Sequence, residues 1–301
     1  MIIIFTKLFN SFFISLFLVL TFSNFSFSEQ KKLKVVTTFT VIKDIVKNVA
    51  GDKASVISIT KPGSEIHGYQ PTPKDLVRTR DADLIISNGF NLEMWFEQFY
   101  SNFENTKRIT LTDGVIPINI NQGDYEGDPN PHAWMSIENI FIYIENVKKG
   151  LIEIDPENKN YYLSNAINYK KNIEKEIFPL REKIRNLPKS KRWLVTCEGA
   201  FSYLAEDLNL KELYLWPINS ESISKPKQIK KVVDAIILHK ISAVFCESTV
   251  SQTPAKQLAK QTNSKYGGIL YVDSLTEENG LVPTYIDLMK ITSQTIFDGL
   301  R

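Results

Sequence analysis

Short apolar runs alternate with amphipathic stretches along most of this chain. The short runs predict strands, and they lie at Leu33–Thr38, Ala54–Thr60, Leu84–Ser87, Arg108–Leu111, Trp193–Thr196, Leu213–Trp216, Ala243–Cys246 and Leu270–Val272. The stretches between them predict helices at Val41–Val49, Leu92–Phe103, Ile137–Leu151, Ala200–Leu208, Lys227–His239, Pro254–Thr262 and Thr284–Leu300, with a further helix start at Thr72 followed by Pro73. Such alternation is typical of parallel sheets with helices on both faces.

The longest helical pattern lies in the middle of the chain, from about Asn158 to Asn186. Its apolar residues recur every three or four positions and form one stripe, and Pro179 within it predicts a kink. We therefore predict an α/β fold with two lobes, each a mainly parallel sheet flanked by helices, joined by one long linker helix. The predicted divisions are 1–28 for a leader, 29–155 for an N-terminal lobe, 156–188 for the linker helix and 189–301 for a C-terminal lobe.

Residues 1–28 have the layout of a secretory signal peptide. One charge, Lys7, precedes an apolar run from Leu8 to Phe22, and small residues occupy Ser26 and Ser28 before the predicted cut. An N-terminal membrane anchor is the alternative, although the apolar run is short for a span. No cysteine lies near the cut. We therefore expect a soluble periplasmic protein without a lipid anchor.

The charge balance and the cysteine count narrow the function classes. With 36 Lys and Arg against 34 Asp and Glu, the net charge of +2 gives no electrostatic basis for binding nucleic acid or an acidic membrane surface. Two cysteines exclude a cysteine-rich scaffold. Cys197 and Cys246 each end an apolar run and precede a glutamate, so in an oxidising compartment they form either a disulfide or two buried thiols.

Two of the three histidines occupy similar positions in the predicted N-terminal lobe. His67 lies in a loop between a strand and a helix, and His132 lies in a proline-containing loop that leads into a helix. Ligands of open α/β sheets bind beyond the carboxyl ends of the strands, so both positions suit a binding site. His239 ends a Lys-rich helix, where a cation suits the helix dipole, and we leave it out of the site.

Several segments, spread over nearly the whole chain, resemble the solute-binding proteins of cluster A-I, the receptors of manganese, iron and zinc ABC importers. The resemblance is carried by His67-Gly-Tyr-Gln-Pro-Thr-Pro-Lys-Asp75, Asn130-Pro-His-Ala-Trp-Met135, Thr196-Cys-Glu-Gly-Ala-Phe-Ser-Tyr-Leu204, Leu215-Trp-Pro-Ile-Asn219, Val244-Phe-Cys-Glu-Ser-Thr-Val250 and Gly268-Ile-Leu-Tyr-Val-Asp-Ser274. The segments appear in the order that the family has.

The resemblance implies four metal ligands: His67, His132, Glu198 and Asp273. The zinc branch of the family usually has a third histidine at the position of Glu198, and often a His-rich loop where this chain has Gln122–Asp128 without histidine. Both departures point to the manganese and iron branch. A site that mixes nitrogen and oxygen ligands also suits Mn²⁺, which is therefore the expected cargo. Fe²⁺ and Zn²⁺ are the alternatives, and Zn²⁺ stays one because it binds most such sites more tightly than Mn²⁺ does.

The resemblance further implies a receptor that delivers its metal to a membrane permease driven by a cytoplasmic ATPase, with limited lobe movement. We expect a monomer. An enzyme is disfavoured, because four protein ligands close the site and no HExxH, Gly-x-Ser-x-Gly or phosphate-loop motif is present. A zinc receptor is the nearer alternative, and a metal-dependent hydrolase or an adhesin the more distant ones. Glu65, Tyr69 and Glu247 are the candidates for holding the ligands in place.

Overall fold

The computed structural model describes residues 31–218 and 226–301, so the predicted signal peptide lies outside the described residues. Within them, residues 33–301 form one compact unit. None of the helices in this described part is both long and apolar enough to cross a membrane.

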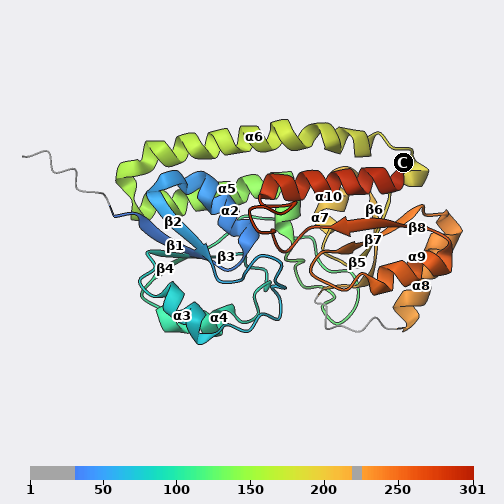
Figure 1. Cartoon of the computed structure of the whole chain (residues 1–301), viewed down its shortest axis with the longest axis horizontal. Helices are drawn as coiled ribbons and strands as arrows, with labels where there is room; N and C mark the ends of the chain where they lie inside the picture. Colours follow the sequence, from blue (N-terminus) through green and yellow to red (C-terminus); the bar gives the residue numbers. More distant parts are fainter. Residues whose placement is uncertain (1–30, 219–225) are drawn as a thin grey trace, which may run out of the picture. The chain divides into compact units, whose positions relative to one another are not determined.

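The first half of the unit contains a four-stranded parallel sheet with helices on both faces (Figure 1). Its strands are β1 (Leu33–Thr37), β2 (Ala54–Ser58), β3 (Leu84–Ser87) and β4 (Lys107–Thr110), in the order β2-β1-β3-β4. The helices are α2 (Thr40–Ala50), α3 (Pro73–Thr79), α4 (Phe96–Tyr100) and α5 (Ile137–Ile154). All four residues of β3 are buried, as expected of a central strand that is covered on both faces.

The second half contains two parallel strand pairs that lie next to each other. They are β5 (Trp193–Glu198) with β6 (Lys211–Trp216), and β7 (Ala243–Glu247) with β8 (Lys265–Leu270). Strand β5 lies beside β7, and a disulfide between Cys197 and Cys246 joins the two strands across a Cα–Cα distance of 5.0 Å. Of the two states that the sequence left open, a disulfide or two buried thiols, the structure has the disulfide. The helices of this half are α7 (Ser202–Leu208), α8 (Pro226–His239), α9 (Thr253–Thr262) and α10 (Tyr285–Leu300).

The long helix α6 (Lys159–Arg185) packs against helices of both halves. It contacts α2 and α5 of the first half and runs alongside α10 of the second (Figure 1). Its buried stripe includes Tyr162, Ile173 and Ile177, and it continues through Pro179. Parallel sheets flanked by helices, together with this helix, confirm the predicted fold class.

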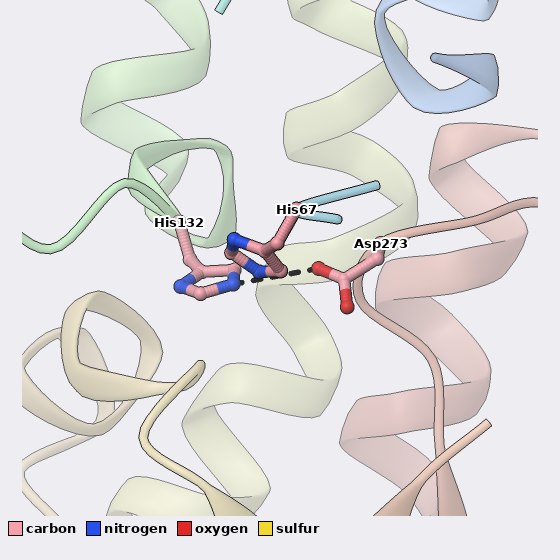
Figure 2. Close-up of side chains that lie close together, drawn as sticks. All are labelled: His67, His132 and Asp273. Atoms are coloured by element: carbon pink, nitrogen blue, oxygen red, sulfur yellow. Dashed lines mark ion pairs between the residues drawn. The ribbon is translucent and has the colours of Figure 1, made fainter. Parts of the chain in front are cut away.

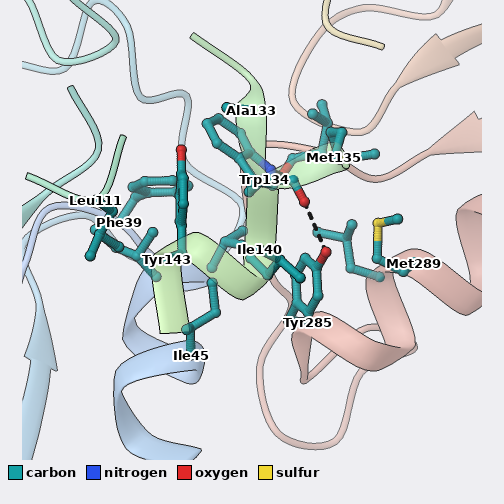
Figure 3. Packing of buried hydrophobic residues seen from close by; sticks show 14 of the residues in the cluster. Phe39, Ile45, Leu111, Ala133, Trp134, Met135, Ile140, Tyr143, Tyr285 and Met289 are labelled. Carbon is teal, nitrogen blue, oxygen red and sulfur yellow. Dashed lines mark hydrogen bonds between the residues drawn. The ribbon is translucent and has the colours of Figure 1, made fainter. Parts of the chain in front are cut away.

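One cluster of buried apolar side chains extends through both halves. Figure 3 shows Phe39, Trp134 and Tyr143 from the first half packed near Tyr285 and Met289 of α10. The hydroxyl of Tyr285 donates a hydrogen bond to the carbonyl oxygen of Trp134 at 2.8 Å. The residue boundaries predicted for the two lobes and the linker helix stay a prediction.

Two elements differ most from the predictions. The last strand ends at Leu270 instead of beginning there, since the backbone of Lys265–Leu270 pairs with β7 although its sequence is not an apolar run. A side chain at Gly267 would collide with the ring of Phe245, so glycine permits this close strand–strand packing. Helix α4 begins at Phe96 instead of Leu92, because the chain first turns around the carboxylate of Glu93, which accepts the N–H of Asn88 at 2.8 Å.

Candidate metal centre

The four predicted ligand residues lie at or beyond the carboxyl ends of strands. His67 lies in the loop between β2 and α3, and His132 precedes the short turn that leads into α5. Glu198 is the last residue of β5, and Asp273 lies three residues beyond β8. The parallel strands therefore direct all four side chains to one region, as expected for an α/β binding site.

The structure brings the four side chains together. Nε2 of His67 lies 3.5 Å from Oε1 of Glu198, and Nε2 of His132 lies 3.8 Å from the same oxygen and 3.4 Å from Oδ1 of Asp273. Figure 2 shows His67, His132 and Asp273 converging. One ligand atom from each of these three residues lies within 4.8 Å of the others, a spacing that suits a single metal ion.

The convergent atoms are sealed from solvent. The four residues have exposed fractions of 3% or less. Nε2 of His67, Nε2 of His132 and Oδ1 of Asp273 are buried and make no hydrogen bond. Buried polar atoms are rarely left without a partner, because their desolvation is then not compensated. A cation bound between them would supply that partner.

Burial and charge set the protonation of the site. Burial, reinforced by repulsion from His132, lowers the pKa of His67 to about 4, so its imidazole is neutral near pH 7 and free to bind a metal. Burial acts to raise the pKa of Asp273, but the contact with His132 outweighs it and holds the pKa below its ordinary value. The site therefore offers a neutral imidazole beside an ionised carboxylate.

The backbone around His67 is held by two neighbours. The carboxylate of Glu65 accepts the N–H of His67 at 2.6 Å and that of Gly68 at 2.9 Å, and Nε1 of Trp95 donates to the carbonyl oxygen of Ile66 at 2.9 Å. Glu65 thus supports the loop through its backbone rather than through the imidazole. The hydroxyl of Tyr69, the second residue proposed from the sequence, donates to Asp75 instead.

Asp75 also completes the predicted start of α3. Its carboxylate accepts the N–H of Thr72 at 2.7 Å, and the Thr72 side chain in turn caps the N–H of Asp75. The resulting capping box fixes the chain as it leaves the His67 loop.

His132 is held by residues that the sequence reasoning missed. Oδ1 of Asn130 lies 2.9 Å from Nδ1 of His132 and accepts its backbone N–H at 3.1 Å. The ring of Trp134 lies 5.2 Å from the imidazole, and its Nε1 donates to the carbonyl oxygen of Val272, next to Asp273. In the sequence, these contacts were indicated only by the position of Asn130 and Trp134 beside His132, in a segment that resembles the family.

Glu247 supports Glu198 from the adjacent strand. Both of its carboxylate oxygens accept the backbone N–H of Glu198, at 3.3 and 3.2 Å. Burial raises the pKa of Glu247 to about 8, so it keeps its proton near pH 7 and adds no net charge there. The nearby Cys197 and Cys246 offer no thiolate, because they are bonded to each other.

His239 takes no part in this site. Its ring stacks on that of Trp193, with the ring centroids 4.5 Å apart, at the opposite end of β5 from Glu198.

Comparison with known proteins places the chain in a family. Residues 35–299 match the ZnuA family, described as zinc-uptake complex component A, periplasmic. The iron-binding protein YfeA of Yersinia pestis is 54% identical over 269 residues, which cover 89% of this chain and 86% of the relative. The manganese ABC transporter substrate-binding lipoprotein PsaA of Streptococcus pneumoniae is 36% identical over 91% of each chain.

The solved structures agree with this placement. The manganese-bound periplasmic metal-binding protein of Candidatus Liberibacter asiaticus is 44% identical, with a TM-score of 0.84 over 90% of this chain and 100% of that one. One prediction is corrected by the comparisons: the expected absence of a lipid anchor, which rested on the lack of a cysteine near the predicted cut, is contradicted by the naming of relatives as lipoproteins. The chain belongs to the ZnuA family, the metal-binding receptors of ABC importers.

Proposed function

We propose that this receptor binds Mn²⁺ or Fe²⁺ through His67, His132, Glu198 and Asp273. Membership of a family of ABC-importer receptors confirms the predicted class of function and the prediction that the chain is not an enzyme. The identity of the metal and its four ligands are the parts of the function proposed here.

The convergence of buried atoms that make no hydrogen bond carries this proposal. Two imidazole nitrogens and a carboxylate oxygen face one another within 4.8 Å, and Oε1 of Glu198 lies within 3.8 Å of both nitrogens. Neutral imidazole combined with carboxylate oxygen suits Mn²⁺ and Fe²⁺. A carboxylate that binds through both oxygens raises the coordination number above four, which a structural zinc site does not favour.

The names of relatives support the same choice. YfeA is named as iron-binding, PsaA is named for manganese, and the Liberibacter protein was solved with manganese bound. The family description names zinc, and Zn²⁺ competes well for most sites with nitrogen and oxygen ligands. Selection of the cargo then depends on geometry and on metal supply.

We place the receptor in the periplasm, following the family description, where it would pass its cargo to a membrane permease coupled to a cytoplasmic ATPase. The chain would perform this delivery as a monomer. A native-mass measurement of the exported protein, with and without metal, tests the monomer.

The deciding experiment is metal analysis of the protein isolated from its own compartment without chelators or added metal. Mass spectrometry should find manganese or iron near one ion per chain, and an Asp273→Asn variant isolated in parallel should contain much less. Zinc near one per chain in the unaltered protein would contradict the proposed cargo. Equal metal in both proteins would contradict the proposed ligands.

A further inference from the structure

A chain of hydrogen bonds extends from the imidazole of His132 into the second half of the protein. Nδ1 of His132 lies 2.9 Å from Oδ1 of Asn130, and Nδ2 of Asn130 lies 3.2 Å from Oγ of Ser202. The hydroxyl of Ser202 donates to Oε2 of Glu212 at 2.7 Å. Asn130 precedes α5, whereas Ser202 begins α7 and Glu212 lies in β6.

The orientation of the Asn130 amide follows from two backbone groups that can act in only one way. The carbonyl oxygen of Gly199 accepts from Nδ2 of Asn130, and the backbone N–H of His132 donates to Oδ1. Oδ1 therefore faces His132, and Nδ1 of the imidazole must carry the proton that it donates to this oxygen. The Ser202 hydroxyl accepts from the same Nδ2 and donates to Glu212, so it helps to hold the amide in this orientation. Nε2 is left with its lone pair, and it is this nitrogen that lies 3.4 Å from Asp273.

The same amide is anchored next to a proposed ligand of the other half. Nδ2 of Asn130 also donates to the carbonyl oxygen of Gly199 at 2.7 Å, directly after Glu198. The hydroxyl of Tyr203 donates to the carbonyl oxygen of Asn130 at 2.8 Å. Asn130 thus contacts the α7 segment through its side chain and through its backbone, and it ties His132 to the strand end that carries Glu198.

Glu212 ends this chain of hydrogen bonds as an acceptor in its ionised form. Its Oε1 is sealed from solvent and makes no hydrogen bond, and burial raises the pKa of the carboxyl to about 7. The ionised carboxylate accepts the Ser202 hydroxyl through Oε2, and Glu212→Gln removes its charge.

We infer that Ser202 and Glu212 are positioning residues for metal binding, which act on His132 through Asn130. This inference rests on the proposed function, since it assumes that Nε2 of His132 binds the cargo. Outer hydrogen-bond partners of histidine ligands fix the tautomer and the ring orientation, and their loss typically weakens metal binding about 10–100-fold. Ser202 and Glu212 lie further from the metal than such a direct partner, so we expect a smaller effect.

The experiment compares Mn²⁺ affinity in the full exported chain and four variants at one pH. Ser202→Ala removes the hydroxyl, Ser202→Thr retains it, and Glu212→Gln removes the charge. Ser101→Ala is the matched control, because that exposed hydroxyl donates to the carbonyl oxygen of Gln98, far along the chain from Asn130 and Glu212. We expect Ser202→Ala to weaken Mn²⁺ binding about threefold to tenfold, with Glu212→Gln in the same direction. Ser202→Thr should restore most of the affinity, and Ser101→Ala should leave it unchanged.

Cobalt spectroscopy separates a positioning role from loss of packing. With Co²⁺ at saturation, Ser202→Ala should alter the visible absorption bands, which report ligand geometry, and Ser202→Thr should return them toward those of the unaltered chain. Loss of affinity with unchanged bands and a lower melting temperature would overturn the inference, as would unchanged affinity in both Ser202→Ala and Glu212→Gln. If His132→Ala also bound Mn²⁺ normally, the proposed site itself would be wrong.

Discussion

At the scale of single residues, the proposed site depends on two buried imidazole nitrogens. Nε2 of His67 and Nε2 of His132 make no hydrogen bond, so replacing either histidine with alanine removes the proposed metal contact without breaking a hydrogen bond at that atom. Loss of a residue that only hydrogen-bonds to a metal ligand already weakens metal binding about 10–100-fold. We therefore expect His67→Ala and His132→Ala each to weaken Mn²⁺ binding at least about tenfold in calorimetry. His239→Ala, which removes an imidazole elsewhere, should bind as the unaltered chain does.

Glu247 predicts how the metal-free protein responds to pH. Burial raises its pKa from 4.5 in the unfolded chain to about 8 in the fold, so between these values the folded state holds the extra proton. Stability due to this group is therefore complete below pH 4.5 and is lost as the pH rises toward 8.

The pH dependence is measured as the melting temperature of the metal-free protein from pH 6.5 to 8. This window avoids the opposite effect of His67, whose pKa is lowered from 6.5 to about 4 and whose stabilisation is lost only as the pH falls below 6.5. The melting temperature should fall across the window, and Glu247→Gln should flatten the decline. An equally steep decline in Glu247→Gln would assign it to other groups, of which Glu212 is the first to test.

The convergence of the four proposed ligands was predictable from the sequence, whereas the residues that hold them in place were not. Residues of the right chemistry at strand ends, together with family resemblance, led to His67, His132, Glu198 and Asp273, which the structure brings together. Their hydrogen-bond partners depend on contacts between distant segments, such as Ser202 with Asn130. Sequence spacing carries no information about those contacts.

At the scale of elements, the sequence predicts best where burial and periodicity coincide. Strand β3 matches its predicted bounds because all four of its residues are apolar or small and lie in the sheet interior. Helix α6 matches within one residue at each end, since its apolar stripe is long. The predicted bounds of β8 were wrong, because two adjacent glycines in a sequence usually indicate a turn. In the structure, Gly267 and Gly268 lie within the strand, and Gly267 leaves room for the ring of Phe245.

The disulfide between β5 and β7 joins elements that do not share a ladder of backbone hydrogen bonds. It closes a chain segment with a sequence separation of 49 residues, so it reduces the conformational freedom of the unfolded chain. Its loss should lower the free energy of unfolding by about 2–4 kcal/mol.

Denaturant unfolding of a Cys197→Ser, Cys246→Ser double variant measures this loss, and the unaltered chain in strong reductant is its control. Both proteins should unfold at lower denaturant concentrations than the oxidised chain, and their free energies of unfolding should be lowered by similar amounts. Equal stability of the double variant and the oxidised chain would show that the disulfide adds nothing to the fold.

At the scale of the whole molecule, the question is whether the two halves unfold together. One apolar cluster includes residues from both halves, and α6 packs against α5 and against α10. A shared core of this kind predicts a single cooperative transition for residues 33–301, in spite of their two separate sets of strands.

Two isoleucines of α6 test this cooperativity. Ile177 is fully buried on the face toward the core, whereas Ile167 is 52% exposed on the same helix. Ile177→Ala should lower the free energy of unfolding by about 2–5 kcal/mol, because it leaves a cavity in the shared core, and Ile167→Ala should change it little. Circular dichroism and tryptophan fluorescence should give the same midpoint for each variant. Two transitions, only one of them shifted by Ile177→Ala, would instead mean that the halves unfold separately and that α6 is a true linker.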